Sequence, residues 1–245
     1  MRLVLLILGL LLFNLTSSTA QLKGLLKSAK EAAGSLTDIK EGNTDGLDIA
    51  GGLKEALNKG VESAVTSLSA KDGYLDSPYK LLLPDDVKNV VRKLKVVPGF
   101  GDVEDKLIKK MNETAELAAK EATPIFVDAI KSITITDAKS ILFGEDDAAT
   151  SYLSAKSRTK LYDAFAPVIQ KAMSTTGITK YWSSVVAKYN KLPLTKDVNP
   201  DLEDHVNNKS LDGLFGLISV KEEGIRSDVS QRTSPLLQDV FSKLD

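Results

Sequence analysis

The chain has 245 residues, with 32 Lys and Arg against 33 Asp and Glu, one His and no Cys. Because the charges nearly cancel, no basic excess exists to neutralise phosphates, and we expect no nucleic-acid partner. The lack of Cys excludes disulfides and Cys–His chemistry, and a single His excludes a His-rich zinc site within one chain. Stability must therefore come from a packed core, which a chain of this length can supply.

The N-terminal sequence, "MRLVLLILGLLLFNLTSSTAQ", is typical of a secretory signal peptide. Arg2 precedes an apolar run, and Ser18 and Ala20 supply the small residues of a cleavage site. We predict a signal peptide over residues 1–20, with a retained N-terminal anchor as the alternative. The apolar run is shorter than the roughly 20 residues of a membrane span. We therefore expect no transmembrane span in the mature chain, and a secreted protein of the extracellular space or periplasm.

The rest of the chain favours an all-α fold: a single multi-helix domain with roughly eight to ten helices and no significant sheet. Residues 21–46 read as a short helix and a polar linker, and residues 47–245 as the helical domain. A long amphipathic helix is expected from Leu47 to about Lys71, and residues 73–84 as an extended connection laid on the core. Further helices are expected at 84–97, 102–122, 124–132, 136–143, 146–155, 157–174, 179–191, 199–220 and 221–244.

Acidic residues gather at the expected helix starts, where unpaired N–H groups and the helix dipole favour negative charge by about 0.3–1 kcal/mol each. They are Asp85-Asp86, Asp102 with Glu104-Asp105, Asp137, Glu145-Asp146-Asp147, and Asp201 with Glu203-Asp204. The alternative for Glu145-Asp146-Asp147 is a metal or catalytic site. Neighbouring helix residues diverge, so such a site would need acids from another segment. We therefore predict no metal site and no cofactor.

Several blocks resemble the bacterial envelope proteins grouped as domain of unknown function 4197. They are "GLKEALNKGVESAVTSL", "DGY", "MNETAELAAKEATPIF", "TDAKSILFGEDDAATSYL", "LYDAFAPVI" and "SLDGLFGLISVKEEGIRSDVSQRTSPLLQDVF". The resemblance covers about residues 53–241 and implies an exported helical domain of unsettled activity. His205 and Thr114 stand where the family pattern has Tyr and Ala, so neither is expected to be an obligatory catalytic group.

Other motifs have structural interpretations that we prefer to functional ones. His205 lies beside Asp201 and Asp204 without a nucleophile elbow, which favours a surface or groove-lining imidazole over a catalytic triad. The Gly-x-Gly in "VPGFGDVEDK" lacks the third Gly and the Lys of a phosphate loop, and predicts a turn. The glycosylation patterns at Asn112 and Asn208 fall in expected helices and carry little weight.

Three features could belong to a binding site between helices. Ala115, Ala118, Ala119 and Ala122 form a smooth helix face, with the polar residues Asn112, Thr114 and Glu116 beside it. Aromatic residues concentrate further along the chain and either pack in the core or line an apolar pocket. They are Tyr152, Tyr162, Phe165, Tyr181, Trp182 and Tyr189. Arg226 and Arg232 are expected to form ion pairs with nearby acids, with an arginine clamp for an acidic ligand as the alternative.

The first functional hypothesis is a non-enzymatic protein that holds a small, largely apolar ligand, lipid or pigment-like, between helices. Its candidate ligand-binding residues are Asn112, Glu116, Tyr152, Tyr162, Phe165, Tyr181, Trp182, His205 and Arg226. The second is a structural or interaction protein of the cell envelope or extracellular matrix, with residues 21–46 as a docking segment. A carboxylate hydrolase using Glu116 or Asp147 comes third, and no catalytic residue is predicted. The sequence leaves the oligomeric state open.

Overall fold

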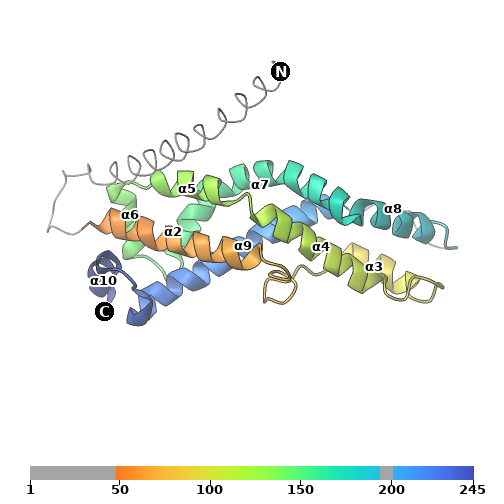
Figure 1. The fold of residues 1–245 in the computed structure, drawn as a ribbon, viewed down its shortest axis with the longest axis horizontal. Helices are drawn as coiled ribbons and strands as arrows, with labels where there is room; N and C mark the ends of the chain where they lie inside the picture. Colours follow the sequence, from red (N-terminus) through yellow and green to blue (C-terminus); the bar gives the residue numbers. More distant parts are fainter. Residues whose placement is uncertain (1–47, 194–200) are drawn as a thin grey trace, which may run out of the picture. The chain divides into compact units, whose positions relative to one another are not determined.

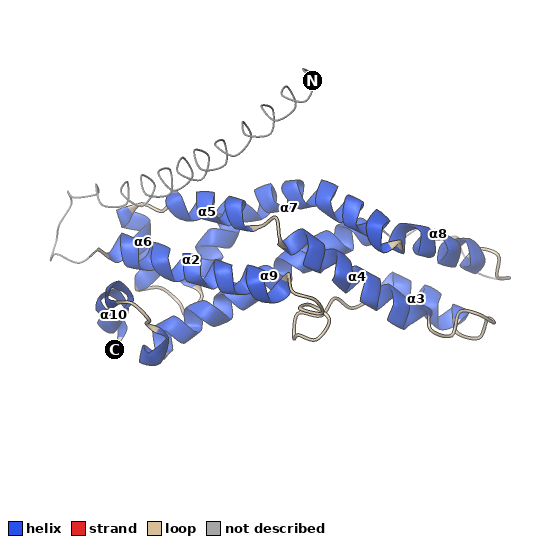
Figure 2. Ribbon diagram, viewed as in Figure 1, coloured by secondary structure: helices blue, strands red, loops and turns tan. Residues whose placement is uncertain are grey.

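The computed structural model describes residues 48–193 and 201–245 (Figure 1). The predicted signal peptide and N-terminal arm lie outside these residues, which belong to one compact unit. Their regular structure is entirely helical, without a strand (Figure 2), and this confirms the all-α prediction. The α-helices are α2 (Ile49–Leu68), α3 (Asp85–Leu94), α4 (Val103–Ala119), α5 (Thr123–Lys131), α6 (Ile135–Leu142), α7 (Ala148–Thr176), α8 (Ile178–Tyr189), α9 (Leu202–Ser227) and α10 (Pro235–Phe241). Two short 3₁₀ helices, Val229–Gln231 and Ser242–Leu244, flank α10. Within the described ranges, no helix is long and apolar enough to cross a bilayer.

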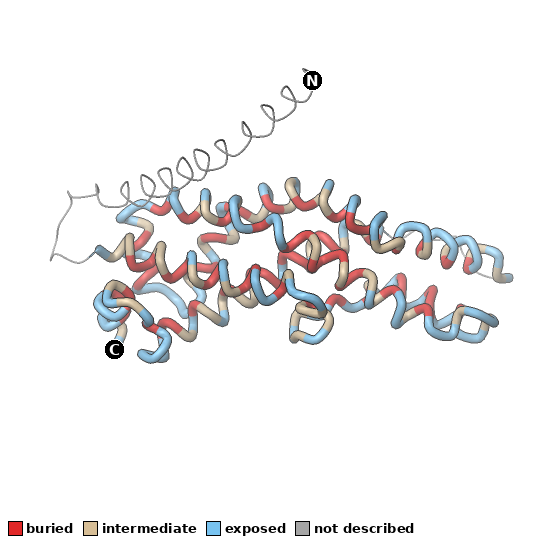
Figure 3. The backbone as a smooth tube through the Cα atoms, viewed as in Figure 1, coloured by how far each residue is buried: buried red, intermediate tan, exposed pale blue. Residues whose placement is uncertain are grey.

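The core lies between α2, α4, α7 and α9, and α9 contacts each of the other three. Buried residues recur along each of these helices, separated by half-buried and exposed ones (Figure 3). On α7 the buried positions Leu153, Ser157, Leu161, Phe165 and Ile169 follow each other at intervals of four. This spacing places them on one helical face, as the periodicity predicts.

Two of the expected breaks between helices are absent in the described residues. The two helices expected at 146–155 and 157–174 are one helix of 29 residues, α7. Ser157 does not interrupt it, because its hydroxyl donates to the Leu153 carbonyl inside the helix. The helix continues through Pro167 and ends at Gly177, which has a positive φ of 71° that suits glycine. At the other end of the sequence, α9 runs without a break across residues 220 and 221 and ends at Ser227.

Most of the predicted acidic helix starts are confirmed. Asp137 completes a capping box with Thr134 at α6, and Asp201 caps α9 by accepting from the N–H groups of Glu203 and Asp204. The prediction for Glu145-Asp146-Asp147 is confirmed only in part: Asp147 is the N-cap residue of α7, but its side chain makes no capping bond, all three acids are exposed, and the first turn contains no acid. The N–H groups of that turn are satisfied by a carboxylate from another helix, which is described below.

Residues 69–84, which we call the strap, connect α2 to α3. The expected extended conformation holds only for residues 80–84, because residues 69–79 form a series of turns. Three strap side chains, Tyr74, Leu81 and Leu83, are buried. The strap therefore lies on the core, as predicted.

Candidate functional site

The strongest polar cluster in the described residues is a buried ion pair on α9. Glu222 and Arg226 are one helical turn apart and each is only 6% exposed. Arg226 Nε donates to Glu222 Oε1 over 2.9 Å. This pairing confirms the predicted ion pair for Arg226.

The two side chains also hold the ends of two other helices. Arg226 donates through Nη1 to the Leu142 carbonyl and through Nη2 to the Ile141 carbonyl, each over 2.9 Å, at the end of α6. Glu222 accepts from the backbone N–H of Ala149 at 2.8 Å and from that of Thr150 at 2.7 Å, at the start of α7. The Thr150 hydroxyl adds a third bond to Glu222, also 2.7 Å long. Each charge therefore faces the helix end of opposite polarity. We call this arrangement the joint clamp.

The same chemistry recurs at other helix ends. Arg232, 2% exposed, donates to the carbonyls of Ile225 and Arg226 at the end of α9. Its guanidinium also forms a two-bond ion pair with Asp245, with both distances 2.7 Å. Lysines bind the last carbonyls of α5 and α7: Lys54 donates to Lys131 O and Lys110 to Thr176 O. Cations that satisfy carbonyls of other helices thus join elements that are distant in sequence.

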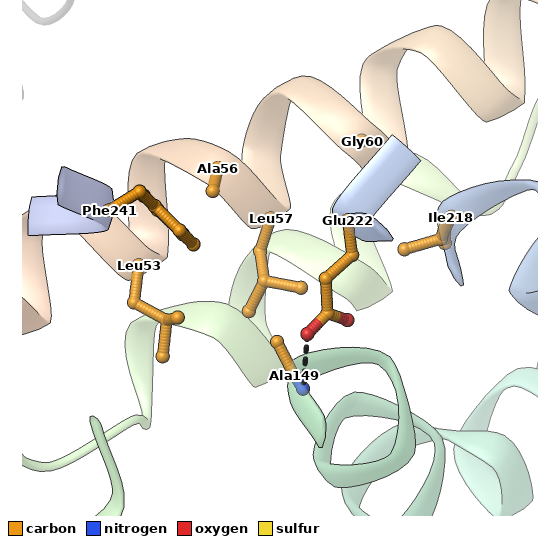
Figure 4. A pocket seen from close by; sticks show the side chains of 8 residues that line it. All are labelled: Leu53, Ala56, Leu57, Gly60, Ala149, Ile218, Glu222 and Phe241. Carbon is orange, nitrogen blue, oxygen red and sulfur yellow. Dashed lines mark hydrogen bonds between the residues drawn. The ribbon is translucent and has the colours of Figure 1, made fainter. Parts of the chain in front are cut away.

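A small cavity adjoins the joint clamp (Figure 4). Glu222 points from α9 toward Ala149, and Phe241 enters from α10. The remaining lining is mostly apolar, from Leu53, Ala56, Leu57, Gly60 and Ile218. Its volume of about 10 Å³ is about what one water molecule needs. The cavity is therefore too small for an organic ligand unless a lining side chain moves.

A second polar pair, Asn112 and Glu116 on α4, holds the strap. The fully buried Asn112 amide accepts from Leu81 N–H at 2.8 Å and donates to Leu81 C=O at 3.0 Å. Glu116 accepts from the backbone N–H groups of Asp72 and Tyr74. Both polar candidates beside the Ala face are therefore engaged with the strap.

The Glu116 carboxylate is not fully satisfied. The side chain is 8% exposed, and its Oε1 is buried without a hydrogen-bond partner in the described part of the chain. Burial raises the pKa of Glu116, and the negative charges of Asp72 and Glu113 add to the effect, while the two N–H bonds from the strap oppose it.

The aromatic candidates do not converge on one site. The Tyr152 hydroxyl donates to Asp137 at 3.1 Å and that of Tyr162 to Asp204 at 2.6 Å, so each links α7 to another helix. Phe165 is fully buried in the core. On α8, the Tyr181 hydroxyl and the Trp182 Nε1–H are buried without a partner in the described ranges.

His205 is a half-buried residue in the first turns of α9, and its ring contacts the strap. One ring nitrogen, Nε2, lies 2.8 Å from the Leu82 carbonyl of the strap. The glycosylation pattern at Asn112 is inaccessible because that side chain is 0% exposed, whereas the Asn208 amide is partly exposed and bonded to Asp204. In the described residues, no three Asp, Glu or His side chains are grouped so that they could hold a metal ion.

Sequence reasoning missed the partners that complete these clusters. The carbonyls of Ile141 and Leu142, the N–H groups of Ala149 and Thr150 and the Thr150 hydroxyl complete the joint clamp. The strap N–H groups complete the Glu116 site. The spacing of four between Glu222 and Arg226, and between Asn112 and Glu116, was the available signal, because it puts each pair on one helical face. Arg232 pairs with Asp245, which lies 13 residues further along the chain, beyond the nearby acids expected as its partners.

The fold and these clusters define a class: an all-α domain whose buried polar side chains join helix ends and a connecting strap. A family model described as a protein of unknown function (DUF4197) matches residues 43–242. The chain therefore belongs to the DUF4197 family, as its sequence blocks suggested. No curated protein and no solved structure matches it.

Proposed function

We propose that this protein works outside the cytoplasm as a non-enzymatic interaction protein of the cell envelope or extracellular matrix. The proposal rests on the role of the buried polar side chains and on the small size of the cavity beside them. The polar atoms of the joint clamp join helix ends, and those of Asn112 hold the strap on α4. The cavity of about 10 Å³ beside the clamp leaves no room for a substrate. A domain built in this way can bind through its surface.

The segment between α6 and α7 is the surface we favour for binding. Phe143 is 63% exposed, and Glu145, Asp146 and Asp147 follow it as exposed acids. The joint clamp fixes the helix ends on both sides, so this exposed segment lies on a rigid support. Exposed aromatic residues are enriched at the centres of protein interfaces. A partner with apolar and cationic groups would complement this surface.

Capture experiments with the immobilised mature chain test the proposal. Native envelope extract would be passed over the wild type, Phe143→Ser and a control, Val96→Ser, in which an 86% exposed apolar side chain of the α3–α4 connection is changed. We expect the same partner on the wild type and the control, and its loss from Phe143→Ser. Equal capture by all three would contradict binding through this surface. Deleting residues 21–46 tests the docking role proposed for that segment.

A second function, the holding of a small apolar ligand such as a lipid or pigment, is favoured by the cavity beside Phe241. Its lining is apolar apart from Glu222, and it lies between α2, α7, α9 and the short α10. Outward movement of Phe241 would enlarge it. Native mass spectrometry of protein purified from its source, with an absorbance scan, is the test. An added mass that is lost on denaturation supports ligand binding, and the bare mass of the chain contradicts it.

A further inference from the structure

Glu116 differs from Glu222, the other buried carboxylate of the described residues, because no cation within those residues balances its charge. Glu222 has Arg226 within 2.9 Å. Glu116 has only the N–H groups of Asp72 and Tyr74, and its Oε1 has no partner in the described ranges. The charges that act on it within those ranges are both negative, Asp72 from the strap and Glu113 from α4 itself. The charged form of Glu116 is therefore the costly one.

The strap segment that Glu116 holds is tightly constrained. Asp72 has a φ of 59°, in the left-handed region that non-glycine residues rarely occupy. A Cβ at Gly73 would lie 2.3 Å from the Ser67 carbonyl oxygen, so only glycine fits there. Tyr74 is fully buried, and its hydroxyl donates to the Ser210 carbonyl of α9 at 2.7 Å. Burial, and next the charge of Glu116, raise the pKa of the Tyr74 hydroxyl, which keeps it neutral. Of the two buried titratable side chains at this contact, Tyr74 therefore stays neutral and Glu116 is the one that can change its charge.

We propose that Glu116 makes the attachment of the strap to α4 sensitive to pH, firm in mild acid and looser toward alkaline pH. When Glu116 is neutral, the repulsion from Asp72 and Glu113 disappears and no unbalanced charge is buried. When Glu116 is ionised, opening the strap lets water reach the carboxylate. Hydration then stabilises the buried charge and weakens its repulsion by Asp72 and Glu113. The strap should loosen at pH values above the ordinary glutamate pKa of 4.5, because the folded protein raises the pKa of Glu116.

Hydrogen exchange of the Asp72 and Tyr74 amides in the full chain tests this proposal. Protection factors, corrected for intrinsic exchange, would be measured from about pH 5 to about pH 8 in the wild type and in Glu116→Gln. In the wild type we expect protection to fall as pH rises, by up to about tenfold for each unit by which the pKa of Glu116 is raised. In Glu116→Gln the corrected protection should not change with pH.

Asp72→Asn provides a second variant, since Asn tolerates the left-handed backbone. Removing this negative charge should move the midpoint of the wild-type pH profile to lower pH. The proposal is overturned by a wild-type profile without pH dependence, by the same slope in Glu116→Gln, or by an unchanged midpoint in Asp72→Asn.

Discussion

Two pairs of buried side chains, each four residues apart on a helix, join separate parts of this domain in different ways. Glu222 and Arg226 on α9 balance each other's charge, and each also binds a helix end of the matching polarity. Asn112 and Glu116 on α4 both bind the strap, but no cation in the described part of the chain balances the Glu116 carboxylate. The first pair therefore joins its helix ends without an unbalanced charge. In the second pair, the attachment of the strap through Glu116 depends on the charge of the carboxylate. The burial of a carboxylate therefore does not show whether its contacts depend on pH, whereas the charges around it do.

The largest expected effect is from Arg226→Ala, which leaves Glu222 charged, buried and without its cation, and frees the carbonyls of Ile141 and Leu142. Removing one partner of a buried pair costs about 3–5 kcal/mol. We expect that loss in the free energy of unfolding, measured by urea denaturation. Lys88→Ala is the control, because its ion pair with Asp85 is exposed and should contribute little to stability. Similar losses in the two variants would contradict the role assigned to the joint clamp.

Gly213→Ala should have an intermediate effect on the strap side of the comparison. A Cβ there would lie 2.6 Å from Cε1 of Tyr74, so the strap would have to shift, at a cost of about 1–3 kcal/mol. Gly60→Ala on α2 is the matched control. Its nearest neighbour atom, on Ile218, would be 3.6 Å away, and the gain in helix propensity should stabilise by about 0.5–1 kcal/mol. Thermal unfolding of both variants checks the opposite signs.

Phe143→Ser should have the smallest effect on stability, within about 0.5 kcal/mol of the wild type, because the side chain is mostly exposed. This result is required if the capture experiment is to report binding rather than folding. Circular dichroism melting of Phe143→Ser and Val96→Ser would measure it. A melting temperature clearly below that of the wild type would instead assign Phe143 to the packing of α6.

The helices were predictable from the sequence because their apolar spacing and acidic starts are local signals. The Asp137 capping box and the acids at the starts of α3, α4 and α9 follow from that chemistry. The single α7 was missed since polar residues such as Ser157 in a core stripe resemble a break, whereas its hydroxyl is satisfied by the preceding turn.

The contacts of the candidate site could not be predicted, because they depend on tertiary structure. The residue that caps the start of α7 is Glu222, which is 72 positions from Thr150, and no local pattern specifies that partner. Likewise, the strap N–H groups that reach Glu116 belong to a turn whose position depends on Tyr74 packing against Gly213. The sequence showed which side chains share a helical face, and the fold determined what each face meets.

The comparison is tested most directly by two isosteric substitutions, Glu222→Gln and Glu116→Gln, each of which removes one buried negative charge. The free energy of unfolding would be measured for both at about pH 8, well above the ordinary glutamate pKa of 4.5. We predict opposite outcomes. Glu222→Gln loses about 3–5 kcal/mol because Arg226 is left buried and unbalanced. Glu116→Gln is as stable as the wild type or more stable, with the difference shrinking as the pH falls toward 4.5. Comparable losses in the two variants, or a larger loss in Glu116→Gln, would contradict the account.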